Sequence, residues 1–310
     1  MKNLKLYFNF GTLLFLAFLS SCQKEVKSTL PAVVTDSATN VLSNAATIYS
    51  KVTGDGSSSI TARGVCWKTS SNPTITDNKT SDGTASGVYT SNISGLTPNT
   101  IYYVKAYTTN SVGTSYGAEI SFTTQIENVV IGTQKWTLKN LNVATYKNGD
   151  IIPQVTDSAQ WANLTTGAWC YYKNDPANEA VYGKLYNWYA VNDSRGIAPA
   201  GWHIPTKEEF ITLTTFLGGD NIAGGKMKTT TLWASPNTGA TNESGFAALP
   251  AGLRGSDASF VNFGKIGWFW TSKEHDATTG VERNLQFDIS DCYMFYIGKG
   301  CGLSVRCIKD

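Results

Sequence analysis

The sequence predicts two folded units, an all-β domain followed by an α+β domain. Residues 31–124 consist of short alternating segments separated by turn clusters such as Gly54-Asp55-Gly56, and no helical period competes with them. Residues 126–310 place short helices first and aromatic strands last, which favours an α+β domain with long loops. With 310 residues, 15% of them charged, and 29 glycines, the chain has the composition of a β-rich exported protein of about two domains.

The N-terminus carries the features of a secretory signal. Lys2 and Lys5 precede the apolar run 13–19, which is too short to span a bilayer. The run ends in Leu19-Ser20-Ser21-Cys22, which resembles a bacterial lipobox, and the resemblance implies that Cys22 is lipidated as the first mature residue. The alternative is an ordinary signal peptide that leaves Cys22 as a free thiol in a flexible tail.

Lipidation would hold the protein on a membrane without a spanning helix, because more than one acyl chain on a single cysteine suffices for stable anchoring. We therefore expect residues 1–21 to be a signal peptide and residues 22–30 a tether. The protein is expected in the bacterial cell envelope, at the outer membrane or on the cell surface. Which leaflet displays it is left open.

The charge of the mature chain excludes one class of partner. Removal of residues 1–21 takes away two of the 25 Lys and Arg residues and none of the 23 Asp and Glu residues, so the mature chain is neutral. A neutral surface gives no electrostatic reason to bind nucleic acid or anionic lipid.

Five cysteines remain once Cys22 is assigned to lipid, and an odd number leaves at least one of them unpaired. Export permits disulfides, although the sequence does not fix their connectivity. We expect Cys170 to pair with Cys307 and Cys292 with Cys301, which leaves Cys66 as a buried thiol in a strand.

The first unit reads as antiparallel strands near 46–52, 62–68, 87–93, 101–108 and 117–124. In the fourth of these, alternation places Tyr102, Val104 and Ala106 on one face.

Residues 96–113 carry a family resemblance. The pattern Leu96-x-Pro98-x-Thr100-x-Tyr102-x-Val104, followed by Ala106, Asn110 and Gly113, resembles the end of a fibronectin type III domain. The resemblance implies an immunoglobulin-like sandwich over residues 31–124, in which Tyr102 returns its hydroxyl to upstream backbone as a tyrosine corner. Such sandwiches mostly serve as spacers or adhesive modules.

The second unit is organised around a helix within residues 201–219. Thr206 and Glu209 form a capping box, and Gly218-Gly219 ends the helix. Phe210, Leu213 and Phe216 are expected on one apolar face. Their expected packing partners are the eight tryptophans of this unit: Trp136, Trp161, Trp169, Trp188, Trp202, Trp233, Trp268 and Trp270.

Shorter elements surround this helix. A hairpin is expected at 129–141 around Gly132-Thr133, and helices at 157–164, 182–191 and 223–229. Trp161, Leu185 and Trp188 are expected to face inward from the first two helices. Strands are expected at 246–249, 268–272, 284–289, 293–297 and 303–308.

Eight phrases of the second unit together resemble the Fibrobacter succinogenes major paralogous domain. They run in order from Gly132-Thr133-Gln134-Lys135-Trp136, through Tyr182-Gly183-Lys184-Leu185-Tyr186-Asn187-Trp188 and Gly201-Trp202-His203-Ile204-Pro205-Thr206, to Ser304-Val305-Arg306-Cys307. This family is similar in turn to the C-type lectin-like fold, which includes formylglycine-generating enzymes. The resemblance implies a C-type lectin-like domain over residues 126–310 and says little about activity.

Motifs for catalysis, metal binding and cofactor binding are missing from the sequence. There are two histidines, His203 and His275, with no HExxH or CxxC motif, no nucleophile elbow and no phosphate loop. His203 is expected to cap local backbone. Asn174-Asp175 and Asn192-Asp193 read as Asx turns, with calcium ligation as the alternative. We therefore expect no catalytic residue, metal or cofactor.

Aromatic side chains are what remains for ligand binding, because they stack on sugar rings and fill peptide grooves. Trp233, in a loop, and Trp268, in a strand, are the candidate ligand-binding residues.

We therefore expect a lipid-anchored surface protein whose lectin-like module binds a carbohydrate or a protein partner without catalysis. One alternative is a structural surface protein that assembles with copies of itself. A second is an enzyme related to the formylglycine-generating fold, using cysteines among Cys292, Cys301 and Cys307.

Overall fold

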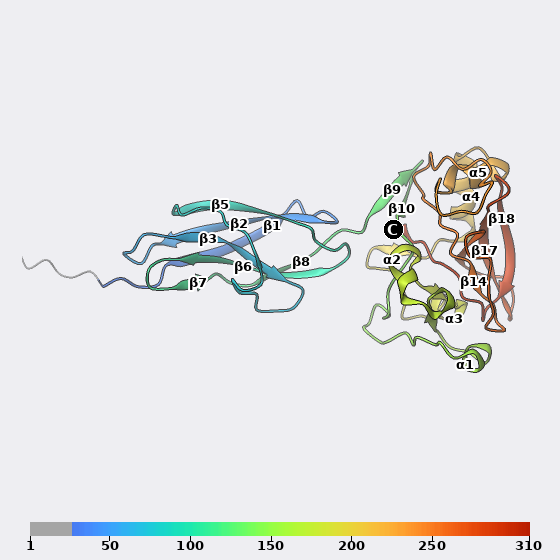
Figure 1. The fold of residues 1–310 in the computed structure, drawn as a ribbon, viewed down its shortest axis with the longest axis horizontal. Coiled ribbons are helices and arrows are strands. Elements are labelled where there is room, and N and C mark those ends of the chain that lie inside the picture. Colours follow the sequence, from blue (N-terminus) through green and yellow to red (C-terminus); the bar gives the residue numbers. More distant parts are fainter. Residues whose placement is uncertain (1–26) are drawn as a thin grey trace, which may run out of the picture. The chain divides into compact units, whose positions relative to one another are not determined.

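A computed structural model describes residues 27–310, so the predicted signal peptide and Cys22 lie outside the described residues. The described chain forms two compact units, of which the first contains Thr47–Ile93 and Tyr102–Phe122 and the second contains Thr123–Asp310 (Figure 1). Among the described helices, none has both the length and the apolar character needed to cross a bilayer.

The first unit contains two antiparallel sheets. One has the order β1-β2-β5 and the other the order β4-β3-β6-β7, with β8 also pairing with β6. The strands are β1 (Ala32–Thr39), β2 (Ala45–Gly54), β3 (Ala62–Lys68), β4 (Asn78–Lys79), β5 (Gly87–Ser94), β6 (Ile101–Thr109), β7 (Thr114–Tyr116) and β8 (Ile120–Thr123).

The alternation predicted for β6 is confirmed, because Tyr102, Val104 and Ala106 are buried. Tyr102 also stacks on Phe122, with ring centroids 6.1 Å apart. The return of its hydroxyl to upstream backbone stays a prediction. The sequence missed β1, whose polar run Thr35-Asp36-Ser37 dilutes the strand pattern.

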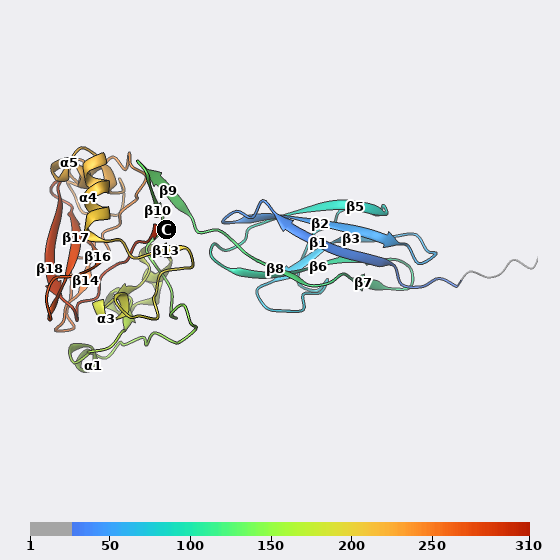
Figure 2. The same ribbon diagram turned by 180° about the vertical axis from the view of Figure 1, so that it is seen from behind.

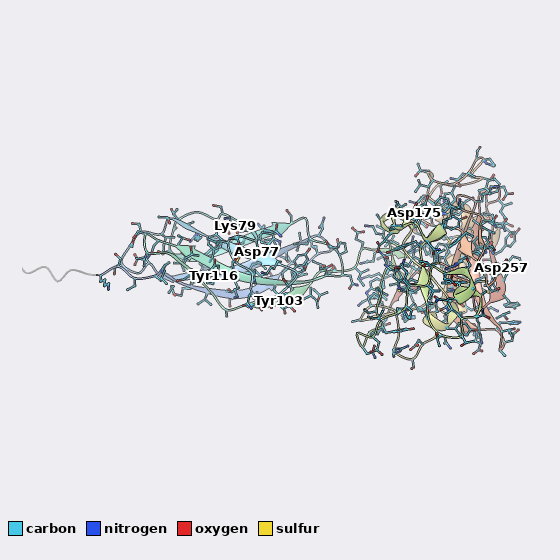
Figure 3. The ribbon with its side chains drawn as sticks, turned by 60° about the horizontal axis from the view of Figure 1, so that its bottom comes forward. Asp77, Lys79, Tyr103, Tyr116, Asp175 and Asp257 are labelled. Atoms are coloured by element: carbon cyan, nitrogen blue, oxygen red, sulfur yellow. The ribbon has the colours of Figure 1, made fainter. Side chains whose placement is uncertain are left out.

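Side chains of Asp77, in the loop between β3 and β4, and of Lys79, in β4, satisfy the backbone of this loop; Figure 3 labels both residues. Asp77 pairs with Lys68 at 3.3 Å and accepts a hydrogen bond from the Thr74 amide at 2.8 Å. Lys79 donates to the Ile75 carbonyl at 3.0 Å. Because the carbonyls and amides of a loop have no partner strand, these side chains provide the hydrogen bonds that a neighbouring strand would otherwise provide.

The second unit, called the head below, opens and closes on one sheet of order β13-β19-β10-β9. Its strands are β9 (Asn128–Ile131), β10 (Gln134–Thr137), β13 (Trp202–His203) and β19 (Ile308–Lys309). The predicted hairpin at Gly132-Thr133 is confirmed by the β9–β10 pairing. Trp136 of β10 pairs with Ile308 of β19, so the last strand of the head lies beside the second strand of its opening hairpin.

A second sheet of the head has the order β16-β17-β18 and lies at the red end of the colour scale (Figure 1). Its strands are β16 (Ile266–Glu274), β17 (Thr279–Gln286) and β18 (Cys292–Gly298). The strand predicted at 284–289 corresponds to β17, which starts five residues earlier, at Thr279. The Asp276 carboxylate accepts hydrogen bonds from the Thr278 and Thr279 amides, so the turn before β17 ends there.

The helix at the centre of the prediction is α4 (Lys207–Phe216), and its Thr206–Glu209 capping box is present with both hydrogen bonds. The expected position of Phe216 is wrong, since its side chain is 63% exposed while Leu217 is buried. Six positions from Phe210 amount to a rotation of about 120° away from the buried face, whereas seven return to it. Phe216 instead lies against Gly132 in the β9–β10 turn.

The predicted helix at 182–191 is wrong. Gly183 has φ 70° and ψ −155°, so α2 (Glu179–Tyr182) ends there and α3 (Trp188–Val191) begins a separate turn. The remaining elements are α1 (Ser158–Ala162), α5 (Asp220–Met227), the 3-10 helices η1 (Tyr172–Asn174) and η2 (Pro176–Asn178), and β11 (Trp169–Cys170), β12 (Leu185–Tyr186), β14 (Leu253–Arg254) and β15 (Phe260–Val261).

The head packs apolar residues on both faces of the β16-β17-β18 sheet. Helices α4 and α5 contact the sheet on the face that carries Phe269 and Leu285 (Figure 2). Trp268 and Trp270 point to the opposite face, into a cluster with Tyr186 and Trp188. All eight tryptophans of the head are buried, but two of them, Trp136 and Trp233, share the apolar cluster of α4, so the expectation that all eight pack against this helix is wrong.

Three buried cations hold the loops of the head by donating to backbone carbonyls. Lys228 donates to three carbonyls at 2.7–2.9 Å. Arg254 binds carbonyls of residues 155–157 and of Ala258. Arg306 binds the carbonyls of Thr137, Phe246 and Ala247, and the Asn140 side chain. Because loops cannot satisfy their own carbonyls, these cations provide partners that a regular sheet would supply.

The predicted disulfides are not formed. The five described cysteines, Cys66, Cys170, Cys292, Cys301 and Cys307, are all free and buried. The expected partners lie in different apolar clusters: Cys170 and Cys307 are in separate clusters, and so are Cys292 and Cys301. The cysteines therefore act as small apolar core residues, which burial permits.

Native protein is expected to resist thiol alkylation at all five of these positions. Burial raises the pKa of Cys170, Cys292 and Cys307 to about 12, so little reactive thiolate forms at neutral pH. Mass spectrometry after iodoacetamide treatment should show these thiols unmodified in buffer and modified in denaturant. A reductant that lowered the melting temperature of the head would contradict this result, because it would reveal a structural disulfide.

Candidate functional site

The two tryptophans predicted to bind ligand are in the core. Trp233 and Trp268 are each 9% exposed, and each belongs to a buried apolar cluster. The Trp233 indole donates to the Thr229 hydroxyl and the Ala248 carbonyl, both at 3.1 Å. Neither indole presents a face to solvent, which contradicts the predicted role of stacking on a sugar ring.

Exposed aromatic rings occur instead on β18, the edge strand of its sheet. Phe295 is 54% exposed and Tyr293 is partly exposed. The two side chains share a face because they are two residues apart, and their ring centroids are 5.7 Å apart at an angle of 42°. We call Tyr293 and Phe295 the aromatic platform. Two adjacent rings on an open strand can stack on a ligand that has flat apolar faces.

Polar side chains run along β17 beside the platform. Gln286 donates to the Asn284 side chain at 3.3 Å, and Asn284 donates to Glu282 at 2.9 Å. The register places Asn284 opposite Tyr293 and Glu282 opposite Phe295, so these groups share the face of the platform. We call Glu282, Asn284 and Gln286 the polar ladder. Amide and carboxyl groups next to aromatic rings provide the hydrogen bonds that fix a ligand's orientation.

Glu282 is the most deeply buried member of the polar ladder, with 2% of its surface exposed. Burial raises the pKa of its carboxyl to about 8, against the lowering effects of the Asn284 hydrogen bond and the Arg283 charge. The carboxyl is therefore mostly uncharged at neutral pH.

The other side of β18 carries a second exposed ring. Tyr296 is 54% exposed and stacks on His275, with ring centroids 3.6 Å apart and planes 5° apart. This stack lies at the β16–β17 connection, since His275 follows β16 directly.

His203 does not cap local backbone as expected. Its Nδ1 lies 2.7 Å from Asp310 Oδ1 and its Nε2 lies 2.8 Å from Glu209 Oε1. Burial opposes the charge, but the hydrogen bonds to the two carboxylates raise the pKa of His203 overall. Glu209 is also the capping residue of α4, so this cluster fastens β13 and the end of the chain to α4.

Calcium ligation is not needed to explain the two Asn-Asp pairs. Asp175, labelled in Figure 3, accepts the Ala177 amide at 2.9 Å and caps η2. Asp193 accepts the Arg195 amide at 3.0 Å and its guanidinium at 2.8 Å. The Asx-turn interpretation of both pairs is confirmed. Within residues 27–310, no three His, Cys, Asp or Glu side chains are grouped as metal ligands.

Sequence reasoning found β18 as a strand but missed the aromatic platform. The continuous apolar run Tyr293-Met294-Phe295-Tyr296 is typical of a strand buried on both faces, so it gave no signal of exposure. Which strand lies at the edge of a sheet depends on pairing between strands that are distant in sequence. The residues of one strand do not predict that pairing.

Comparison with known proteins places the head in a sequence family. Residues 129–309 match the family model described as the Fibrobacter succinogenes major domain. No curated protein matches the chain.

Solved structures similar to the chain include fibronectin type III domains. One from the human KIAA0970 protein is 12% identical, with a TM-score of 0.23, over 30% of this chain and 72% of that chain. One from human fibronectin type III domain containing protein 3 is 17% identical, with a TM-score of 0.23, over 33% and 92%. The sensor domain of the anti-sigma factor RsgI4 in Pseudobacteroides cellulosolvens is 18% identical, with a TM-score of 0.25, over 32% and 98%.

Proposed function

The chain belongs to the Fibrobacter succinogenes major domain family, and from this premise we propose that it is a lipid-anchored bacterial surface protein whose head binds carbohydrate without catalysis. The fibronectin type III-like unit then serves as a spacer between the lipid and the head.

The aromatic platform is the observation that carries this proposal. Phe295 leaves more than half of its surface in water on an edge strand, although the head buries all eight of its tryptophans. A single exposed ring such as Phe216 is ordinary, whereas the adjacent Tyr293 and Phe295 rings form a contiguous apolar patch, and such patches mark interaction surfaces. The polar ladder adds amide and carboxyl groups on the same face, and rings with adjacent hydrogen-bonding groups suit the alternating apolar and hydroxyl-bearing surfaces of a sugar.

A C-type lectin-like architecture is part of the proposal. It is supported by the pairing of β10 with β19, which joins the two ends of the head, and by the separate sheet β16-β17-β18. Long loops connect these sheets, as the sequence predicted for an α+β domain.

Cys22→Ser is expected to release the protein from the membrane fraction. The proposed anchor is lipid on Cys22, and without it the neutral mature chain has no electrostatic attraction to anionic lipid. Cell fractionation with metabolic labelling by a fatty-acid analogue checks the result. Continued sedimentation of the variant with membranes, or absence of label in the parent, would contradict a lipid anchor.

Phe295→Ala is expected to weaken carbohydrate binding by about tenfold, because loss of one stacked ring removes on the order of 1.4 kcal/mol. The measurement is isothermal titration calorimetry against a panel of neutral, acidic and amino-sugar oligosaccharides. The variant should fold normally because the Phe295 side chain is largely exposed.

Phe216→Ala is the matched control. Phe216 is also an exposed phenylalanine of the head, but it lies on α4 against the β9–β10 turn, away from β18. Its removal is expected to leave the affinity unchanged. The proposal fails if the parent binds nothing in the panel, or if the two alanine variants bind equally well.

The chemistry of the three C-terminal cysteines supports a non-catalytic head. An oxidase related to formylglycine-generating enzymes would need its active-site cysteines grouped at one place, and within residues 27–310 no three His, Cys, Asp or Glu side chains are grouped as metal ligands. Cys292 also lies in a different apolar cluster from Cys301 and Cys307.

A further inference from the structure

Glu282 has a buried oxygen that nothing in the described chain satisfies. Its Oε1 accepts from the Asn284 side chain at 2.9 Å, whereas its Oε2 is buried without a hydrogen-bond partner. An unpaired buried polar atom costs folding free energy, so each one in a native structure needs a reason, and a functional role is one such reason.

The Trp188 indole provides a second unpaired polar atom on the same face. Its Nε1 is buried without a partner among residues 27–310. The indole lies directly on Gly280, where an added Cβ would come within 2.5 Å of the ring. Gly280 is two residues from Glu282 on β17, so both residues face the same side of the sheet. One donor and one oxygen without partners thus adjoin the same stretch of strand.

Aromatic rings flank the unpaired oxygen. The register places Trp270 of β16 and Phe295 of β18 directly on either side of Glu282. The faces of aromatic rings carry negative charge density and attract cations, and a carboxylate among them adds a formal charge. The chemical complement of the ionised Glu282 carboxylate among these rings is an ammonium group rather than an anion.

We propose that Glu282 recognises the ammonium group of an amino sugar whose ring stacks on the aromatic platform. This inference rests on the proposed function and names the class of sugar. A ligand would approach Glu282 beside Phe295, its cross-strand neighbour, which is more than half exposed. The ammonium then donates to Glu282 Oε2, while the Trp188 indole donates to a hydroxyl of the same sugar.

Binding of the ammonium is linked to the protonation of Glu282. The buried carboxyl is uncharged at neutral pH, so forming the ion pair requires that it lose its proton. The other ionisable groups around it are fixed: Arg283 is bound to the Cys292 carbonyl, and Lys299, over the Trp188 ring at 4.8 Å, is paired with Glu274. Burial is the main cause of the raised pKa of Cys292, with a smaller contribution from a Glu282 charge, so Cys292 stays a thiol. Affinity should therefore rise with pH toward about 8, until the sugar amine itself loses its proton.

The test compares two glucosamine hexamers of equal length, one fully deacetylated and one fully acetylated. Calorimetry at pH 7 measures both against the parent protein, Glu282→Gln, Phe295→Ala and the control Phe216→Ala. The parent and the control are expected to bind the deacetylated hexamer at least tenfold more tightly than the acetylated one. Glu282→Gln is expected to bind the two hexamers equally, and Phe295→Ala to weaken binding of both.

Each other outcome is decisive. Equal binding of the two hexamers by the parent overturns the inference and leaves the proposed function standing. A preference that survives Glu282→Gln also overturns the inference, and assigns the unpaired oxygen to a structural water. Failure of the parent to bind either hexamer or any other sugar of the panel overturns the proposed function as well.

Discussion

Arg306→Met is expected to destabilise the head by about 4 kcal/mol or more, enough to unfold it near physiological temperature. The guanidinium is fully buried and donates to three backbone carbonyls and to Asn140 Oδ1 at 2.7–3.0 Å. Methionine fills a similar volume but leaves these four acceptors without partners. Each unsatisfied buried acceptor costs about 1–3 kcal/mol before relaxation.

Tryptophan fluorescence during urea unfolding measures this effect selectively, because eight of the nine tryptophans lie in the head and Trp67 alone lies in the first unit. Arg195→Met is the matched control. Arg195 is a partly exposed arginine in surface ion pairs with Asp150 and Asp193, so its loss should cost less than about 1 kcal/mol. A loss of similar size in both variants would contradict the role assigned to Arg306.

Glu282→Gln is expected to stabilise the head at alkaline pH by about 3–5 kcal/mol. Burial raises the pKa of Glu282 from 4.5 to about 8. Between these values the folded chain binds more protons than the unfolded chain, so the stability of the parent falls as pH rises from about 4.5 to about 8 and then levels off. Glutamine keeps the shape and the Asn284 contact without a group that must ionise.

Urea unfolding at pH 5, 7 and 9 checks this expectation. The difference in unfolding free energy between Glu282→Gln and the parent should be smallest at pH 5 and largest at pH 9. Glu243→Gln, at an exposed ion pair with Lys226, serves as the control and should follow the parent at all three values. A constant difference across the range would mean that Glu282 ionises in the folded head as freely as in water.

Local chemistry allowed some elements to be predicted residue by residue. The Thr206–Glu209 capping box and the Gly132-Thr133 turn each depend on hydrogen bonds or backbone angles within a few positions, and both are present. The misplacement of Phe216 came from treating a spacing of six residues as equivalent to seven. The break at Gly183 was missed because apolar residues on both sides of it are buried and so imitate a helical period.

Features that depend on packing between distant parts of the chain could not be predicted from the sequence. Trp233 and Trp268 were expected at a ligand site because an aromatic residue in a loop or strand looks the same whether buried or exposed. Only the packing of the β16-β17-β18 sheet, with apolar clusters on both faces, buries them and leaves Phe295 at the open edge. The predicted disulfides were wrong for the same reason, because Cys292 and Cys301 are close in sequence but lie in different apolar clusters.

The buried cations explain how an irregular head holds together without the predicted disulfides. Lys228 and Arg254 each connect loops distant in sequence through carbonyl oxygens, as Arg306 does. Hydrogen bonds of this kind are insensitive to the redox state of the surroundings. The head should therefore keep its fold in reducing and oxidising compartments alike.

The pairing of β10 with β19 also governs how this domain can be exchanged between proteins. A domain whose opening hairpin and last strand lie in one sheet has its two ends near each other, so it can be inserted into a surface loop of a host chain with little separation of the flanking backbone. Recombination between genes can therefore transfer the whole domain to another protein. A circular permutant that joins the two ends of the head through a short glycine linker should retain the same fold.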